Sequence, residues 1–236
     1  MNFVLVHGGW CGGWWMSKLG RILRLRGVET FTPTLTGLGE REHLASPEVG
    51  LNTHIQDITA VLHYEDLRDV VLVGHSYGGA VVTGAADRAR DRIKRLIYFD
   101  GFVLRNGQSL ADHFTPAMTQ AFIDLAKSQG GGWRAPCPFT MEQFGVTSPE
   151  DIAWNERGMV MQPLKPLTEP LTLQADPVPF PVSYIHCAAN PMGLFEKSAA
   201  YAKAQGWQYV EVALTHAAPA VAPQACADLL MEIAGR

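Results

Sequence analysis

The amino-acid sequence predicts an α/β fold, in which a mainly parallel sheet is flanked by helices and interrupted by an inserted helical cap. Two observations lead to this fold class. Short apolar runs alternate with segments of helical periodicity along the chain, and this alternation is typical of βαβ units. The alternation is broken between residues 103 and 181 by a stretch too long for a simple connection between neighbouring strands.

Length and composition fit one such domain. The chain has 236 residues, of which 47% are hydrophobic and 18% charged, and this balance is typical of a protein with a substantial core. The formal net charge of -4 gives no indication of a nucleic-acid or anionic-membrane partner. Because the apolar run at residues 3–6 is too short for a signal-peptide core or a membrane span, we expect a cytoplasmic protein without a membrane partner.

The cysteines exclude two other classes of protein. The chain has 4 cysteines, which are too few for a disulfide scaffold. They are scattered, without the paired spacing of a structural zinc site, so we expect no metal.

Six short runs are predicted to be the strands. The run at residues 70–73, Val-Val-Leu-Val, is apolar throughout, as expected for a central strand of a parallel sheet. Another run is stopped by Pro33, which cannot donate to a strand ladder. In chain order the runs are residues 3–6, 29–32, 70–73, 96–99, 182–186 and 209–214.

Helices are predicted between these runs. The first should end at Gly27, because glycine readily takes the left-handed cap; its apolar stripe is Leu19, Ile22, Leu23 and Leu25. The second should begin at Thr53, which forms a capping box with Gln56. Further helices are expected at about residues 79–88 and 194–205. On the closing helix, Cys226, Leu229, Leu230 and Ile233 share one face.

The long interruption is interpreted as a cap over the carboxyl edge of the sheet. It should be partly helical, at residues 117–127 and 150–156. The alternative is a disordered linker, but its aromatic residues and methionines argue against disorder. The predicted division is therefore a core of residues 1–102 and 182–236, with residues 103–181 as the cap.

The strongest functional motif is Gly-His-Ser-Tyr-Gly-Gly at residues 74–79. It follows the central strand directly and precedes a helix, which is the context that G-x-S-x-G requires in a nucleophile elbow. Such a turn leaves the hydroxyl of Ser76 exposed at the end of its strand. The alternative is a glycine-rich turn that only packs a helix on a strand.

A second motif, His-Gly-Gly-Trp, follows the first strand at residues 7–10. In enzymes with a nucleophile elbow, a backbone amide from this loop and the amide after the nucleophile hold the oxyanion. Gly9 and Tyr77 are the predicted donors, with Trp10 close to them. His7 is predicted to be structural, with its imidazole bound to backbone groups.

The predicted general base is His216. Of the 8 histidines, it alone lies between the last strand and the last helix, and its place after the serine in chain order is the one this arrangement requires. His75 lies inside the elbow with its side chain directed away from the serine hydroxyl. Residues 113 and 186 are not excluded by the sequence, although His186 is expected to pack at a strand end.

The acid that orients the base has several candidates. The usual segment, residues 187–191, has no carboxylate, and Asn190 stands there instead. Asp100 ends the strand next to the nucleophile strand and keeps the order Ser, Asp, His, so we predict Asp100 as the acid. The alternatives are Asn190 as a neutral orienting group, Glu196 from the following helix, and a role of Asp100 as a cap for loop amides.

Three motifs together resemble a known group of enzymes. Residues 3–10 (Phe-Val-Leu-Val-His-Gly-Gly-Trp), 33–41 (Pro-Thr-Leu-Thr-Gly-Leu-Gly-Glu-Arg) and 71–79 resemble the EstC-type bacterial esterases, which are similar to the plant methylesterase and hydroxynitrile lyase group of the α/β-hydrolase fold. The resemblance extends over most of the chain, with the cap weakest. It implies a six-stranded parallel sheet with a helical cap, no cofactor and ester hydrolysis, with carbamates such as carbendazim as substrates of some relatives.

The resemblance is incomplete at two positions. Asn190 departs from the plant enzymes, which have an aspartate there. Lyases of the group have a lysine directly after the catalytic histidine, whereas Ala217 follows His216 here, and this argues against cyanohydrin chemistry.

The sequence therefore predicts a serine hydrolase that cleaves a small carboxylic ester or carbamate through an acyl-enzyme on Ser76, as a monomer or homodimer. The expected pocket is apolar and tolerant of aromatic groups, with Trp10, Cys11, Trp133 and Trp154 as candidate lining residues. The same catalytic groups would serve a lactone. Two other functions remain open, because fold alone does not decide chemistry: a lyase or C–C cleaving enzyme, and a non-catalytic protein that binds a small molecule.

Overall fold

Six parallel strands form the main sheet of the computed structural model, which describes residues 1–174 and 178–235. The strands are β1 (Asn2–Val6), β2 (Glu29–Phe31), β3 (Val70–Ser76), β4 (Ile93–Gly101), β7 (Val182–Cys187) and β8 (Gln208–Val212). Their order across the sheet is β2-β1-β3-β4-β7-β8. The six predicted runs are thus all strands, and the predicted α/β class with a parallel sheet is confirmed.

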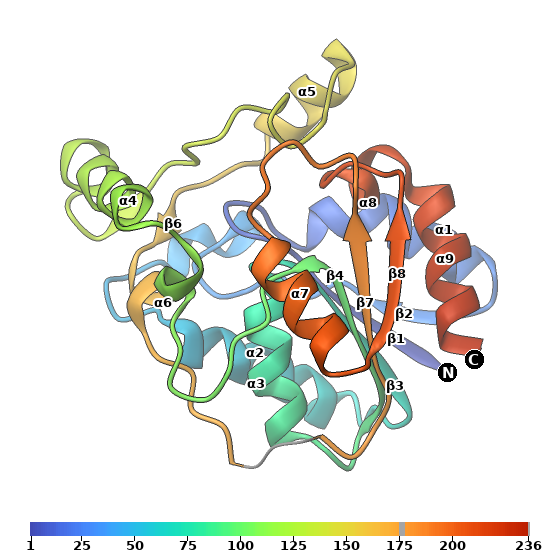
Figure 1. The fold of residues 1–236 in the computed structure, drawn as a ribbon. Helices are drawn as coiled ribbons and strands as arrows, with labels where there is room; N and C mark the ends of the chain where they lie inside the picture. Colours follow the sequence, from blue (N-terminus) through green and yellow to red (C-terminus); the bar gives the residue numbers. More distant parts are fainter. Residues whose placement is uncertain (175–177, 236) are drawn as a thin grey trace.

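Helices cover both faces of this sheet (Figure 1). On one face lie α1 (Ser17–Leu25) and α9 (Pro223–Gly235), and on the other lie α2 (Leu51–Tyr64), α3 (Gly78–Arg88) and α7 (Glu196–Ala204). Alternate residues of a strand point to opposite faces, so Phe3 packs against α1 and α9 while Val4 packs against the other layer. The two apolar layers are why central runs such as residues 3–6 of β1 and 70–73 of β3 are apolar throughout.

Two details of the predicted helices are wrong. Leu25 was placed on the apolar stripe of α1, but it is 79% exposed, because it lies two residues, or about 200° of helix rotation, beyond buried Leu23. Thr53 does not begin α2. The helix begins at Leu51, and the Thr53 hydroxyl accepts a hydrogen bond from the Gly50 N–H at 3.3 Å, so Thr53 serves as the third residue of the first turn.

The insertion between β4 and β7 lies largely beyond the carboxyl ends of the strands (Figure 1). Both predicted helices in it are present, and three further elements accompany them. The set is α4 (Pro116–Gln129), β5 (Arg134–Ala135), α5 (Pro149–Glu156), β6 (Gln162–Pro163) and α6 (Lys165–Thr168), with a 3-10 turn at Leu110–His113. The later part runs back along the core, where buried Leu171 packs against Gly84. The boundaries of the predicted cap, residues 103–181, stay a prediction. Residues 175–177 of that cap and residue 236 of the predicted core lie outside the described residues.

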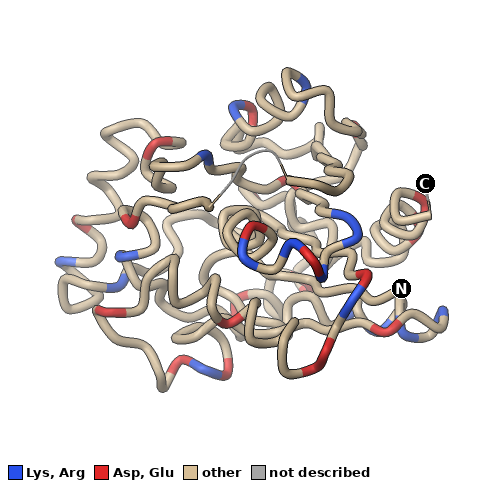
Figure 2. Tube along the Cα trace, turned by 90° about the horizontal axis from the view of Figure 1, so that it is seen from below, with Lys and Arg blue, Asp and Glu red and all other residues tan. Residues whose placement is uncertain are grey.

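Three short elements complete the described chain. They are the 3-10 turns at Gly13–Met16 and Gly39–Leu44 and the helix α8 (Ala218–Val221), which lies between β8 and α9. Basic and acidic residues alternate around the trace (Figure 2). Within residues 1–174 and 178–235, no helix has both the length and the apolar character that crossing a bilayer would need.

Candidate active site

The predicted nucleophile lies at the tip of β3. Ser76 is the last residue of that strand, and its φ of 54° is in the left-handed region, which is strained for a residue other than glycine. The turn leaves no room for side chains beside it. A Cβ on Gly74 would lie 2.4 Å from Val82, and one on Gly78 would lie 2.5 Å from the Val6 carbonyl oxygen. Helix α3 starts directly behind the serine, and its first amides favour negative charge there.

His216 reaches the same place from the loop between β8 and α8. Its side chain is 2% exposed, and its Nδ1 lies 2.7 Å from Asp100 Oδ2. Since a carboxylate oxygen accepts, Nδ1 carries the hydrogen and Nε2 is left with a free lone pair. The imidazole stacks on Phe195, with the ring centroids 4.7 Å apart, and on Phe144 at 5.7 Å. The ring orientation of His216 is therefore set by an acid and by two aromatic faces.

Asp100 can meet His216 because β4 is irregular at this residue. His75 pairs with Phe99 and Ser76 with Gly101, so Asp100 has no partner in β3, and its φ is 43°. A bulge of this kind redirects a side chain. The Asp100 carboxylate is fully buried, and its Oδ1 accepts the Cys187 N–H at 3.3 Å.

The alternatives to Asp100 are arranged around it. Asn190 donates its Nδ2–H to Asp100 Oδ2 at 2.7 Å, so its amide supports the carboxylate. His186 Nδ1 lies 3.7 Å from Asp100 Oδ1 on the other side. Glu196 is 67% exposed and lies 3.6 Å from His186 Nε2. Asp100 thus makes the contact with His216, while its role in catalysis stays a prediction.

The loop after β1 lies directly against the serine. A Cβ on Gly8 would come within 3.0 Å of Ser76 Cβ, which explains why the backbone can approach so closely there. Gly9 is next to Tyr77, since a Cβ on Gly9 would lie 4.0 Å from Tyr77 Cβ. The N–H of Trp10 already donates to Gln162 Oε1 at 3.1 Å. Among the three predicted oxyanion residues, the amides of Gly9 and Tyr77 are therefore the better candidates.

The predicted structural role of His7 is confirmed. The Leu35 N–H donates to His7 Nε2 at 3.1 Å, so the hydrogen is on Nδ1, which donates to the Gly8 carbonyl at 2.7 Å. Burial lowers the pKa of His7 to about 4. The neutral imidazole thus connects β1 to the loop after β2 and holds the backbone next to Ser76.

Two further histidines support the site, and the sequence analysis did not find them. His54 Nε2 donates to the Thr36 carbonyl at 2.9 Å, so its Nδ1 accepts the Tyr77 hydroxyl at 2.7 Å. His75 Nε2 donates to the His216 carbonyl at 2.9 Å. Burial lowers the pKa of both imidazoles, so the neutral forms are favoured. Neither is expected to be the base, because His54 precedes the nucleophile in the chain and the His75 side chain is directed away from the serine hydroxyl. No pattern in the sequence indicates which backbone or hydroxyl group each would meet.

Comparison with known proteins identifies the family. Residues 3–229 match the Alpha/beta hydrolase family. The chain belongs to the α/β-hydrolase family. A carbendazim hydrolyzing esterase from Nocardioides sp. (strain SG-4G) is 41% identical over 180 residues, which are 73% of this chain and 73% of that protein.

Other relatives of this α/β hydrolase are more distant. The putative methylesterase 11 of Arabidopsis thaliana is 26% identical over 73% of this chain, and the match spans about half of the plant protein, 47%. Among solved structures, an extracellular alpha/beta-hydrolase from a Paenibacillus species superimposes with a TM-score of 0.85 and 26% identity, covering 100% of this chain and 99% of that one. Its description states structural and functional homology to tobacco salicylic acid binding protein 2.

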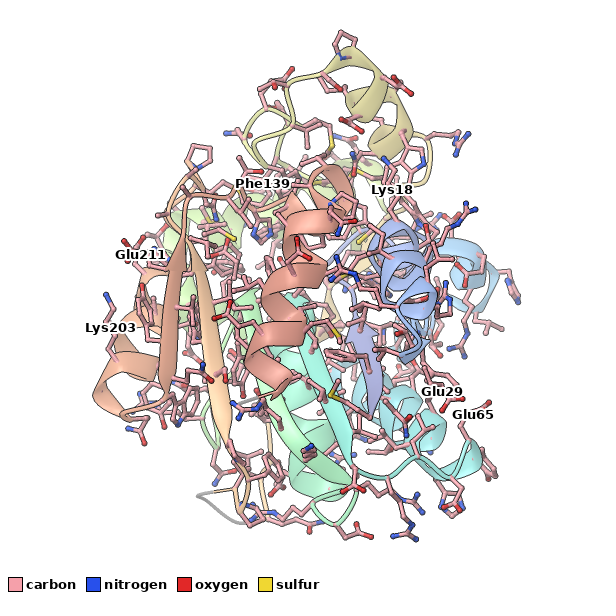
Figure 3. All side chains as sticks on the ribbon, turned by 90° about the vertical axis from the view of Figure 1, so that its right-hand side faces the viewer. Lys18, Glu29, Glu65, Phe139, Lys203 and Glu211 are labelled. Carbon is pink, nitrogen blue, oxygen red and sulfur yellow. The ribbon has the colours of Figure 1, made fainter. Side chains whose placement is uncertain are left out.

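Of the two cavities that both Ser76 and His216 line, the larger has a volume of about 610 Å³ including its open mouth and lies between the cap and the carboxyl edge of the sheet of this hydrolase. Ser76, His216, Gly9, Trp10 and Tyr77 line it together. The rest of its wall is mainly aromatic and aliphatic. Six phenylalanines contribute: Phe102, Phe114, Phe122, Phe139, Phe144 and Phe195. Figure 3 shows Phe139 where the cap meets the sheet, whereas labelled charged residues such as Lys203 and Glu65 lie at the periphery.

A second cavity, of about 440 Å³ including its open mouth, borders the same candidate catalytic groups. Ser76, His216 and Phe144 line both cavities. Cys11 lines the second one, as predicted for a pocket residue. Burial raises the pKa of the Cys11 thiol well above its usual range, and the thiol donates to the Gly8 carbonyl at 3.4 Å, so this cysteine is a wall residue and a poor nucleophile.

The pocket prediction is wrong for two tryptophans, since neither Trp133 nor Trp154 lines either cavity. Trp154 packs edge-on against Trp14, with ring centroids 4.9 Å apart, and Lys18 Nζ lies 4.2 Å from its ring. The Arg134 guanidinium lies 5.1 Å from the Trp133 ring. Both indoles are half-buried, and Trp154 packs cap helix α5 against Trp14 and Lys18 of the core. In residues 1–174 and 178–235, no group of three or more His, Cys, Asp or Glu side chains is placed to hold a metal ion.

Proposed function

We propose that this α/β hydrolase cleaves carboxylic esters through an acyl-enzyme on Ser76, with His216 as general base and Asp100 as the acid that orients it. The observation that carries the proposal is the placement of His216. Its Nδ1 is bound by Asp100 at 2.7 Å, while its ring lines the same two cavities as Ser76. An imidazole with one nitrogen on a buried carboxylate and the other free is suited to remove a hydroxyl proton.

In the first half of the reaction, Ser76 Oγ attacks the ester carbonyl carbon while His216 Nε2 takes the hydroxyl proton. The carbonyl π electrons move to oxygen, and the N–H groups of Gly9 and Tyr77 hold the resulting oxyanion. Asp100 stabilises the imidazolium. The tetrahedral intermediate then expels the alkoxide, which receives the proton from Nε2 and leaves as the alcohol.

In the second half, a water molecule gives its proton to His216 Nε2 and attacks the acyl carbon. The bond from that carbon to Ser76 Oγ breaks, and the proton returns to the serine. The products are the carboxylic acid and free enzyme. Tight support of Asp100 by Asn190 and Cys187 keeps the carboxylate in place through both halves.

The aromatic wall indicates the substrate class. Six phenylalanines in the wall of the larger cavity favour an ester with an aromatic or other apolar group. The second cavity can take the other side of the ester. The relative named a carbendazim hydrolyzing esterase supports carbamates as well, since a carbamate presents the same kind of carbonyl. The predicted cytoplasmic location and oligomeric state stay predictions.

The experiment that tests this function is capture of the acyl-enzyme. 4-Nitrophenyl acetate is mixed with the protein, the reaction is quenched in acid, and the peptides are analysed by mass spectrometry. We expect one added acetyl group on Ser76 and a burst of nitrophenol equal to the enzyme concentration. Ser76→Ala should show neither. Steady hydrolysis by Ser76→Ala, or an acetyl group on another residue only, would refute the proposal.

A further inference from the structure

Trp10 binds the cap to the loop that faces the nucleophile. It makes three hydrogen bonds to the cap, two of them to the ribbon formed by β5 and β6. Its indole N–H donates to the Ala135 carbonyl in β5 at 3.1 Å, and its backbone N–H donates to Gln162 Oε1 in β6 at 3.1 Å. Its carbonyl accepts the N–H of Val160, which precedes β6, at 2.8 Å. Ala135 and Gln162 are partners in the ribbon. The position of Gln162 is therefore fixed from two sides.

These contacts also fix which way the Gln162 amide points. A backbone N–H can only donate, so the atom that faces Trp10 must be the carbonyl oxygen of the carboxamide. That oxygen lies 3.6 Å from the place of a Cβ on Gly9, next to the predicted oxyanion loop. The Nε2 group is consequently at the other end of the amide. It has two N–H donors, and among residues 1–174 and 178–235 no hydrogen-bond partner for it is found.

The two Nε2–H donors of Gln162 belong to a cavity wall with few other polar groups. Gln162 lines the larger cavity, whose wall is otherwise largely apolar. Of the other polar side chains there, the Tyr77 hydroxyl is taken by His54, and the indole N–H of Trp10 is taken by Ala135. Ser76 and His216 are assigned to the reaction. A bulky apolar ligand that fills the cavity would strip water from Gln162 Nε2, and an unpaired buried donor is costly.

We propose that Gln162 is a specificity-determining residue, which donates Nε2–H to a hydrogen-bond acceptor carried by the bulky group of the substrate, apart from the reacting carbonyl. The favoured substrates are then esters whose aromatic group bears a carbonyl, an ether oxygen or a ring nitrogen. This inference rests on the proposed function and narrows its substrate class. A site that holds a donor in an apolar wall rejects ligands that leave the donor unpaired.

The test compares 1-naphthyl and 2-naphthyl acetate with the isomeric quinolinyl acetates, in which one ring CH is replaced by nitrogen. Each kcat/KM is divided by the rate of alkaline hydrolysis of the same ester, which removes differences in leaving-group reactivity. Gln162→Glu keeps an acceptor for the Trp10 N–H and loses the donors, whereas Gln162→Met loses both. Gln129→Met, at the exposed end of α4, is the matched control. Circular dichroism verifies that each variant is folded.

We expect the wild type and Gln129→Met to prefer at least one quinolinyl isomer roughly tenfold, which is the usual effect of one hydrogen bond. Both Gln162 variants should abolish that preference, whereas Gln129→Met should hydrolyse naphthyl acetate at close to the wild-type rate. The proposal is overturned if the wild type prefers no isomer, if the variants keep the preference, or if they lose activity equally on all esters, since that would make Gln162 only an anchor for the loop.

The same ligands separate this inference from the proposed function. Their dissociation constants are measured with Ser76→Ala, by quenching of tryptophan fluorescence, because Trp10 lines the cavity. If no ester is hydrolysed in a Ser76-dependent way, the proposed function fails. The ratio of dissociation constants, with and without the Gln162 donors, still decides whether Gln162 recognises the acceptor.

Discussion

The carboxyl edge of the sheet and the cap contribute to this site in different ways. The edge supplies polar groups that are buried and held by several partners: Asp100 is fully buried and has contacts with His216, Asn190, Cys187 and His186. The cap supplies mainly apolar side chains from short elements and the loops between them. The candidate catalytic groups thus depend on strand ends and on the bulge in β4, whereas the shape of the larger cavity depends on the cap.

The largest expected effect is at the sheet edge, where two imidazoles face one carboxylate. His216→Ala should lower kcat by roughly 10⁶-fold, because nucleophile, base and acid act as one catalytic unit and this variant lacks the base. His186→Ala should lower kcat by roughly tenfold or less, since its ring is 3.7 Å from Asp100 and it does not line the cavities. Hydrolysis of 4-nitrophenyl acetate measures both. Equal losses would mean that the base has been misassigned.

Next in size is the acid. Asp100→Asn should lower kcat by roughly 10⁴-fold, because an amide neither fixes the correct tautomer of His216 nor stabilises its positive charge. Asn190→Ala should cost roughly tenfold, since it removes one donor at 2.7 Å from a carboxylate that keeps the Cys187 N–H. Pre-steady-state rates of acetylation are the measurement. If Asn190→Ala is the more damaging change, Asp100 is not the acid.

A matched pair of phenylalanines compares the stability of the two regions. Phe99 is in β4 with 1% exposure, and Phe122 is in cap helix α4 with 4%. Phe99→Ala should lower the free energy of unfolding by about 3–5 kcal/mol. Phe122→Ala should cost less, because its ring already borders the cavity, and should raise KM for aromatic esters. Urea unfolding and steady-state kinetics distinguish them; a greater loss of stability for Phe122→Ala would contradict the comparison.

Acid should weaken the sheet edge through its buried histidines. Burial lowers the pKa of His7 from 6.5 to about 4, so between these values the unfolded chain binds a proton that the folded chain does not. Stability is therefore complete above about pH 6.5 and falls as the pH decreases toward 4, by up to about 3 kcal/mol for this residue. Urea unfolding at pH 7 and pH 5 measures the loss.

A matched pair of variants assigns that pH effect. His7→Gln should reduce the difference in unfolding free energy between pH 7 and pH 5. The exposed His43→Gln should leave it unchanged. A pH dependence that is the same in both variants would show that His7 is not its source.

The smallest effect on activity is expected for the two cap tryptophans outside the cavities. Trp133→Ala and Trp154→Ala should change kcat/KM for aromatic esters by less than about twofold, because neither indole lines a cavity. Kinetics with naphthyl acetate measure this. A large rise in KM for either variant would mean that the cap closes further over the substrate.

Much of the fold could be predicted because local pattern and burial agree. Apolar runs such as residues 70–73 are strands, since only a two-faced sheet buries every side chain in them. The elbow at Ser76 was predictable because its glycines have no alternative: a Cβ on Gly74 or Gly78 would clash. The start of α2 differs from the prediction, because a threonine can be the N-cap residue of a helix or the third residue of its first turn. In α2, Thr53 is the third residue, and its hydroxyl accepts the N–H of the N-cap residue Gly50.

What the sequence determined by itself is the α/β architecture, the elbow with Ser76, and the position of His216 after the last strand, since these follow from local patterns and chain order. Only the tertiary structure decided how His216, Asn190 and His186 are arranged around the Asp100 carboxylate, which imidazoles support Tyr77 and His216, and which cap side chains line the cavities. These contacts join residues far apart in the chain, such as Trp10 and Gln162. They depend on strand order, on a bulge in β4 and on the path of the cap, none of which has a local signature.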